Sequence, residues 1–212
     1  MIVSHPARVL FVHVQKTGGS SVQSVLLERL PGAEKLAGLP GAKHAHLTDA
    51  LAHDPGLATY WTFGFVRNPW ARLWSWWSMI SRREDQRAGG NAWADRRIAN
   101  NAFWRGTLEL ETFERFVLEG PDRFARLRTP QRDYLRAGER EADFTGRTES
   151  FGADFRTACE HLGIEAPPEE PRRNADPGAA QRPPYREQYT PAMRDRVAEL
   201  FAADLDAYGY DF

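Results

Sequence analysis

The segment that most constrains the fold is residues 8–30, RVLFVHVQKTGGSSVQSVLLERL. Residues 8–14 are rich in β-branched and aromatic side chains, which is typical of a buried strand. After the loop 15–21, QKTGGSS, apolar residues recur with the helical period at Val22, Val25, Leu26 and Leu30. One face of a helix is therefore expected to be buried. The segment predicts a strand, a glycine-containing loop and a helix, and we expect an α/β fold.

A loop of this kind points backbone N–H groups and the positive end of a helix at one place, which favours a phosphate group. Gly18 and Gly19 allow a tight turn and a close approach of the backbone to a ligand. Lys16 adds a positive charge. Hydroxyl donors are available from Thr17, Ser20 and Ser21, and either serine could also cap the helix. The alternative interpretation is a plain turn whose lysine is solvated.

A second strand followed by a helix is predicted over residues 61–80, WTFGFVRNPWARLWSWWSMI. Residues 61–66 are apolar and predict a buried strand. Asn68 is a favoured cap and Pro69 a favoured first residue of the helix, which we expect to run to about Arg87.

Arg67 lies at the end of this second strand, beside the capped start of the helix. Its guanidinium group offers a planar fork of donors for a phosphate group, so a second anion site is predicted there. Ser75 follows Asn68 by about two helical turns and falls on the same side of the helix as the cap. Two phosphate sites some 50 residues apart imply a nucleotide with phosphate groups at both ends.

Two histidines lie between these motifs, His44 and His46, in the stretch KHAHLTDAL, where a short helix is predicted near residues 47–53. An imidazole titrates near neutral pH and can take a proton from an alcohol, so either histidine is a candidate general base. A metal site is a second interpretation, although other clustered ligands are missing. Surface histidines on a loop are the third.

The first loop differs from the common P-loop, in which the lysine follows the last glycine. It resembles the 5′-phosphosulfate loop of sulfotransferases, written PKTGGTS, with Gln15 in place of proline and Ser20-Ser21 in place of Thr-Ser. Residues 65–75, FVRNPWARLWS, resemble the 3′-phosphate signature of that family, FVRNPYDRLLSAY. The resemblance extends from Val9 to Phe212 and is poor over residues 88–128.

The resemblance implies a sulfotransferase dependent on 3′-phosphoadenosine 5′-phosphosulfate (PAPS), a soluble, bacterial-type member of the carbohydrate branch (type 2, heparan/chondroitin-like). The implied fold is a three-layer α/β sandwich with a central, mainly parallel sheet, similar to P-loop proteins. The implied donor-binding residues are Lys16, Thr17, Gly18, Gly19, Ser20, Ser21, Arg67, Ser75 and Arg147, the last from the element GRTES at 146–150. Lys16 is also expected to act in catalysis, by neutralising charge on the leaving group. His46 is the favoured base, because His46-Leu47-Thr48 fits the register of the family, and His44 is kept as the second candidate.

We expect one sulfotransferase domain over residues 1–212, because 212 residues with 42% hydrophobic content suit a single core. Residues 85–140 are expected to be helical and to lie on the acceptor side, including the PQ pair at 130–131. A short strand is predicted over residues 144–147, and the helix that follows it is expected to stop at Gly163. Residues 166–184 hold six prolines and predict an extended loop. A helix from Pro191 to a stop at Gly209 is expected to close the chain.

Composition narrows the function classes. The net charge of −1 does not suggest a nucleic-acid partner. The single cysteine, Cys159, leaves no internal disulfide and falls on the apolar side of a predicted helix. No stretch approaches the length of a membrane span, and no leader is recognised at the start of the chain, so we expect a cytoplasmic protein.

The predicted function is transfer of a sulfuryl group from PAPS to a hydroxyl of an acceptor, expected to be a carbohydrate, without a metal. The oligomeric state stays open. Two alternatives remain. One is a P-loop phosphotransferase that uses ATP or GTP, which the order of the lysine and the glycines, and the lack of an aspartate for magnesium after a strand, argue against. The other is a nucleotide-binding protein without activity.

Overall fold

The computed structural model describes residues 1–169, 171 and 183–212, so much of the proline-rich segment 166–184 lies outside the described residues. The chain divides into two compact units. The first is Met1–Arg67 with Gln131–Ala175, and the second is Asn68–Pro130 with Asp176–Phe212. The single domain expected over 1–212 stays a prediction.

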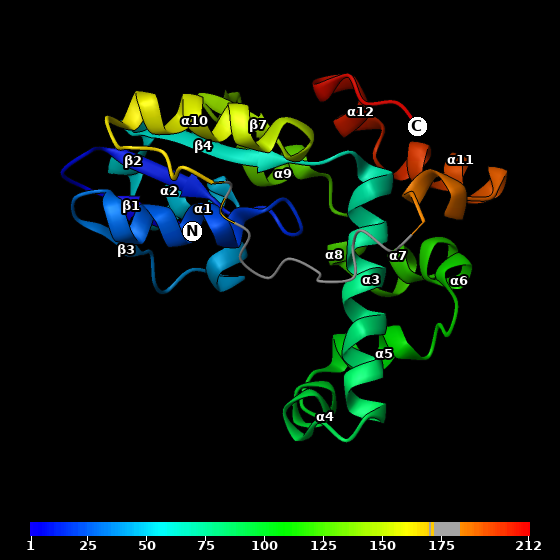
Figure 1. Cartoon of the computed structure of the whole chain (residues 1–212). Coiled ribbons are helices and arrows are strands. Elements are labelled where there is room, and N and C mark those ends of the chain that lie inside the picture. The colour runs from blue at the N-terminus through cyan, green and yellow to red at the C-terminus, as the bar shows by residue number, and fades with distance from the viewer. Residues whose placement is uncertain (170, 172–182) are drawn as a thin grey trace. The chain divides into compact units, whose positions relative to one another are not determined.

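The first unit contains a five-stranded sheet (Figure 1). Its strands, in spatial order, are β3 (Ala33–Lys35), β1 (Ile2–Ser4), β2 (Val9–Val12), β4 (Trp61–Val66) and β7 (Phe144–Arg147). β4 lies between β2 and β7 and is parallel to both, whereas β1 is antiparallel to its two neighbours. Four strands therefore run in one direction, which confirms a mainly parallel sheet. The three parallel neighbours were predicted, and β1 and β3 were not.

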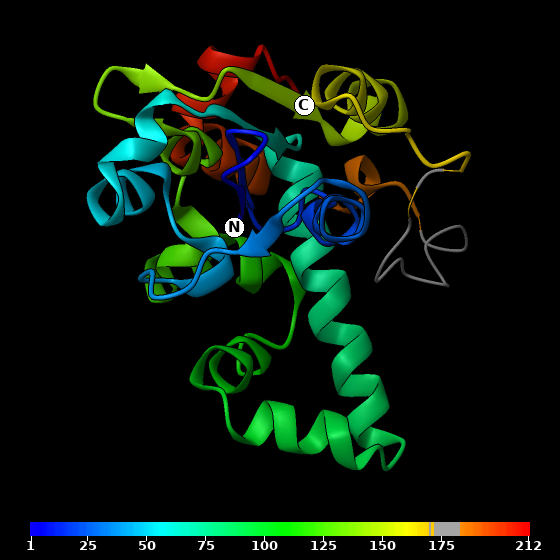
Figure 2. The ribbon, with the colours of Figure 1, turned by 90° about the vertical axis from the view of Figure 1, so that its left-hand side faces the viewer.

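Helices cover both faces of this sheet. Phe63 and Phe65 of β4 pack with apolar residues of α1 (Gly19–Arg29) and α10 (Phe151–Leu162). On the opposite face Gly64 lies against Leu135 of α9 (Gln131–Leu135), and α9 in turn contacts α2 (Leu47–His53). Figure 2 shows α1 and α10 on one side of the strands and α2 on the other. The first unit therefore has three layers.

Shorter elements complete the first unit. They are the 3₁₀ helices η1 (Ala42–His44), η2 (Pro55–Thr59) and η3 (Thr148–Ser150), and the hairpin of β5 (Arg136–Ala137) with β6 (Arg140–Glu141). Cys159 of α10 is buried in the core, as predicted. Burial raises the pKa of its thiol to about 11, so this cysteine is an inert part of the packing.

The second unit is helical. Its elements are α3 (Pro69–Ala88), α4 (Ala92–Ala99), α5 (Ala102–Leu108), α6 (Phe113–Leu118), α7 (Gly120–Arg123), α8 (Ala125–Arg128), η5 (Tyr185–Gln188), α11 (Pro191–Leu200) and α12 (Ala202–Tyr208). The Oδ1 atom of Asn68 accepts hydrogen bonds from the amides of Trp70 and Ala71, which confirms the predicted cap. The core is aromatic and includes Trp70, Trp76, Phe103, Phe116 and Phe201.

The single closing helix predicted from Pro191 is wrong, because the chain leaves helical geometry at Phe201. The backbone of this residue has φ −114° and ψ 24°, and it ends α11 and begins α12. Its ring is buried in the aromatic core of the second unit. We attribute the break to that packing, which the helical period of the sequence does not show.

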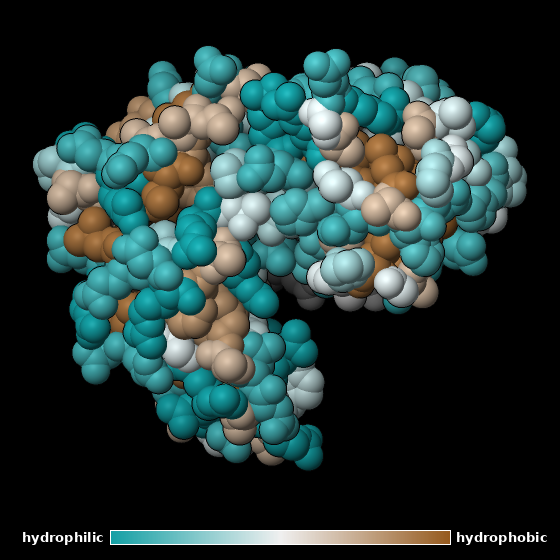
Figure 3. All heavy atoms as spheres, turned by 180° about the vertical axis from the view of Figure 1, so that it is seen from behind, coloured by the Kyte–Doolittle hydropathy of each residue, from teal (hydrophilic) through white to brown (hydrophobic). Residues whose placement is uncertain are grey.

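The surface seen in Figure 3 is mostly hydrophilic, with separate apolar groups. Among the described residues, the exposed large hydrophobic side chains are Leu27 and Trp93, which are 39% and 50% exposed. None of the helices in the described ranges has the length and apolar character that crossing a bilayer requires.

Candidate functional site

The loop between β2 and α1 is held in a strained turn. Lys16 has φ +70° and Gly18 has φ +77°, so both lie in the left-handed region. This region costs a residue with a side chain about 1–2 kcal/mol, and such strain tends to be retained where function requires it. The hydroxyl of Thr17 is buried and donates to the carbonyl of Val14 over 3.0 Å. The hydroxyl hydrogen of Thr17 is therefore used in a hydrogen bond that stabilises the loop.

The N-cap of α1 is Gly18, and the expectation that Ser20 or Ser21 caps the helix is wrong. The turn closes earlier, because Gly18 is left-handed and its carbonyl accepts from the amide of Ser21 over 2.8 Å. Both serines consequently lie in the first turn of the helix. Gly18 has no side chain that could accept from the first amides, which suits an anion at this helix end.

A buried histidine, His13, packs against the start of α1. A Cβ atom at position 19 would overlap its imidazole ring, so only glycine fits there. The ring is 3% exposed, and among the described residues its Nδ1 atom has no hydrogen-bond partner. Burial, with a further contribution from His44, lowers the pKa of His13 to about 2. A neutral imidazole therefore supports the loop.

His44 lies beside this histidine. Its Nδ1 atom is 2.9 Å from the carbonyl oxygen of His13, and the two ring centroids are 4.6 Å apart. A carbonyl oxygen only accepts hydrogen bonds, so Nδ1 of His44 carries the proton and Nε2 of the neutral ring holds the lone pair. The fold thus brings His44 to the loop as a proton acceptor.

His46 has different surroundings. Its ring centroid is 4.2 Å from that of Tyr134 on α9, and its amide donates to the Oδ2 atom of Asp49 at the start of α2. The two histidine rings therefore have different neighbours: His44 packs on His13, and His46 packs on Tyr134. Among the described residues, no group of three or more His, Cys, Asp and Glu side chains is placed to share a metal ion.

Arg67 directly follows β4, and a buried glutamine holds its backbone. The amide of Arg67 donates to Oε1 of Gln131 over 2.9 Å, and Nε2 of Gln131 donates to the carbonyl of Arg67 over 2.7 Å. One residue earlier, the hydroxyl of Thr148 donates to the carbonyl of Val66 over 2.9 Å. Sequence reasoning did not find the roles of Gln131 and Thr148, and its only signal at Gln131 was the PQ pair.

Arg147 is exposed at the end of β7, where it is in register with Val66 of β4. Its amide donates to Oδ2 of Asp154 over 2.6 Å, and the same oxygen accepts from the hydroxyl of Ser150. The parallel strands β2, β4 and β7 therefore end at one edge of the sheet with the Lys16 loop, Arg67 and Arg147. Ligands of open parallel sheets bind at this edge.

The second unit carries the remaining predicted donor-binding residue. Ser75 lies in α3 and is half-buried. Nearby, Arg72 is 2% exposed, donates to the carbonyl of Thr129 and lies over the ring of Phe201. Arg72 is therefore part of the packing of the second unit.

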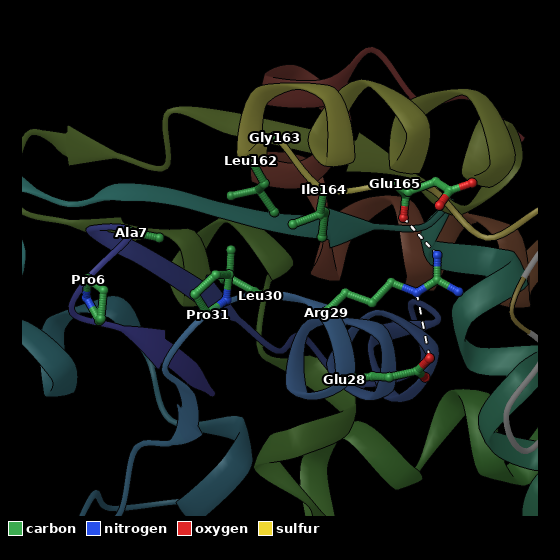
Figure 4. A pocket seen from close by; sticks show the side chains of 10 residues that line it. All are labelled: Pro6, Ala7, Glu28, Arg29, Leu30, Pro31, Leu162, Gly163, Ile164 and Glu165. Carbon is green, nitrogen blue, oxygen red and sulfur yellow. Dashed lines mark hydrogen bonds and ion pairs between the residues drawn. The ribbon is translucent and has the colours of Figure 1, made fainter.

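Other residues of the first unit line a surface hollow (Figure 4). It is bounded by the end of α1, the end of α10 and the turn after β1. Within it, Nη1 of Arg29 donates to the carbonyl of Glu165 over 2.9 Å. The hollow contains none of the predicted site residues.

The family model described as "Sulfotransferase family" matches residues 1–211. The match includes the loop after β2, both histidines, Arg67, Ser75 and Arg147. Searches of curated proteins and of solved structures gave no match.

Proposed function

Because the chain belongs to the sulfotransferase family, whose members transfer a sulfuryl group to a hydroxyl acceptor, we propose that its donor is PAPS and its fold is P-loop-like. The observation that carries this proposal is the common edge of β2, β4 and β7. There the strained loop of Lys16 can bind the 5′-phosphosulfate, and Arg67 can bind the 3′-phosphate, with Arg147 as a further contact. Ser75 is proposed as a ligand of the 3′-phosphate from its place in the family signature alone.

In the proposed reaction the acceptor oxygen attacks sulfur in line with the leaving phosphate oxygen. A new S–O bond forms, the S–O bond to the 5′-phosphate breaks, and 3′,5′-phosphoadenosine leaves with the electron pair. Lys16 and the amides of Gly18, Gly19 and Ser20 stabilise the charge that develops on the leaving oxygen, whereas the amide of Ser21 is bonded to the carbonyl of Gly18. Preorganised donors of this kind contribute several kcal/mol to catalysis.

The acceptor proton moves to a histidine, and the geometry favours His44 over the initially preferred His46. His44 contacts the loop through the carbonyl of His13, and that contact leaves Nε2 as the proton acceptor. The ring of His46 instead packs on Tyr134.

Titration calorimetry tests the donor. We expect wild-type protein to bind 3′,5′-phosphoadenosine at least tenfold more tightly than adenosine 5′-phosphate, because a charge-assisted hydrogen bond contributes about 1.5–3 kcal/mol. Arg67→Ala should reduce this affinity ratio about tenfold. Arg156→Ala, which changes an exposed arginine of α10, is the matched control. Preference for ATP or GTP with magnesium would contradict the proposal and favour a phosphotransferase, and binding without sulfuryl transfer would favour an inactive nucleotide-binding protein.

For the acceptor we propose an anionic carbohydrate. The proposal is supported by a group of side chains at α3 and α4, which we call the Trp93 surface. The guanidinium carbons of Arg83 and Arg97 lie 4.2 and 5.6 Å from the centroid of the exposed Trp93 ring. A shallow hollow beside it is lined by Trp93, Arg96, Arg97, Asn100 and Asn101. Residues 82–105 carry six arginines and three carboxylates, although the whole chain has a net charge of −1. Guanidinium groups suit carboxylate or sulfate, and an indole ring suits the apolar face of a sugar.

Replacing Trp93 by alanine is expected to weaken binding of a uronic-acid oligosaccharide about tenfold. The sugar would lose its contact with the indole ring, and the guanidinium groups of Arg83 and Arg97 would lose the ring that holds them in place. Affinity electrophoresis or calorimetry would measure this. Leu27→Ala removes the second exposed large hydrophobic side chain found in the described part of the chain and should leave the affinity unchanged. Equal binding of neutral and anionic oligosaccharides, or unchanged binding by Trp93→Ala, would exclude this surface as the acceptor site.

A further inference from the structure

Gln131 makes two hydrogen bonds at the point where strand pairing ends. Arg67 lies one residue beyond β4, the central strand of the three parallel ones. Both its amide and its carbonyl are paired with the side chain of Gln131, which is fully buried. A backbone group that is removed from water without a hydrogen-bond partner is destabilising, so this side chain takes the place of the missing strand neighbour.

The two hydrogen bonds also determine the orientation of Arg67. In extended backbone the N–H and C=O groups of one residue point to the same side. One planar amide that binds both groups therefore restrains the peptide planes on either side of Arg67. Restraining both planes restrains the direction in which the guanidinium side chain leaves the sheet.

The helix that carries Gln131 is itself held close to the sheet. α9 lies beside β4, as Figure 1 shows. Leu135 of α9 occupies the space that a side chain at Gly64 would fill. It is almost fully buried, as is Tyr134. Gln131 therefore projects from a packed element and not from a loose connection.

We propose that Gln131 is a positioning residue that orients Arg67 and thereby sets the selectivity for a nucleotide with a 3′-phosphate. This inference rests on the proposed function, because it requires that Arg67 contacts that phosphate. It predicts a specific defect: loss of Gln131 should affect the 3′-phosphate and leave recognition of the rest of the nucleotide unchanged.

The test compares the affinities for 3′,5′-phosphoadenosine and adenosine 5′-phosphate in wild-type protein and Gln131→Met, which has similar length but no amide. We expect Gln131→Met to weaken binding of the bisphosphate about tenfold and to leave adenosine 5′-phosphate unchanged. Adding Arg67→Ala to Gln131→Met should cause less loss than the two single changes together. Gln131→Asn retains the amide, but its side chain is one methylene too short to reach Arg67. We therefore expect the same change in the ratio of the affinities for 3′,5′-phosphoadenosine and adenosine 5′-phosphate.

The matched control is Thr107→Val in the second unit. Thr107 is also fully buried, and its hydroxyl donates to the carbonyls of Phe103 and Trp104. This change removes buried hydrogen bonds elsewhere, so it should lower stability without changing the affinity ratio. Equal weakening of both nucleotides by the Gln131 variants, or no weakening, would overturn the positioning role. If wild-type protein shows no preference for the bisphosphate, the proposed function itself fails.

Discussion

Replacing His44 by alanine is expected to lower turnover by about 10²- to 10⁴-fold, the usual contribution of a general base. The donor affinity should stay unchanged, because the proposed role of His44 is to take a proton from the acceptor and not to bind the donor. Nδ1 of His44 is engaged by the carbonyl of His13, so Nε2 is the basic nitrogen of the neutral ring. Single-turnover assays with saturating donor would separate this effect from a change in binding.

His46→Ala is the matched control, because this histidine is two residues away and packs on Tyr134. We expect it to retain turnover within a few-fold of wild type. His44→Gln retains a hydrogen-bonding side chain but cannot accept a proton at neutral pH, so it should be as slow as His44→Ala. Full turnover in His44→Ala and loss in His46→Ala would transfer the role of the base to His46.

Acidification from pH 7.5 to 4.5 is expected to reduce the free energy of unfolding by about 3 kcal/mol through His13 alone. The pKa of this imidazole falls from 6.5 to about 2 in the folded protein, chiefly because of burial. Below pH 6.5 the unfolded chain takes up a proton that the folded chain does not. The stability is therefore fully present above pH 6.5 and is lost as the pH falls toward the folded pKa, by about 1.4 kcal/mol for each pH unit.

Urea titrations at pH 7.5 and 4.5 on wild-type protein and His13→Leu would isolate this contribution. Carboxylates titrate in both proteins, so the difference between the two pH dependences reports on His13. Leucine has a similar volume, and residue 13 keeps the carbonyl that binds His44. Identical pH dependences would show that His13 takes up its proton within the folded state.

Sequence reasoning predicted the elements whose signals are local. The helix Leu47–His53 and the strand Phe144–Arg147 occupy the residues expected for them. Asn68 caps α3 as predicted, and α10 ends at Gly163, which is left-handed. In each case a cap, a glycine or a periodic apolar face is visible without knowledge of distant contacts.

The missed elements depend on pairing with distant residues. β1 and β3 have three residues each, which is too short for a periodic pattern. β3 consists of Ala33, Glu34 and Lys35, and it is a strand because it pairs with β1. Its composition carries no strand signal.

The candidate site shows the same limit. The Lys16 loop and Arg67 are recognisable because each motif is contiguous. Two histidines two residues apart were both candidates, and only the fold shows that His44 contacts the loop, through a residue 31 positions away. Gln131 acts on a residue 64 positions away, so no local pattern could reveal its role.

The contact between Gly64 and Leu135 has a consequence for the evolution of the family. A side chain at position 64 would overlap Cδ2 of Leu135, so the Leu135 side chain or the helix that carries it would have to shift. Any shift of α9 would alter the distance between the amide of Gln131 and Arg67. Positions 64, 131 and 135 are therefore constrained as one group, although only position 67 belongs to the donor signature. Relatives that retain the arginine but carry a larger residue at 64 should show compensating changes at 131 and 135.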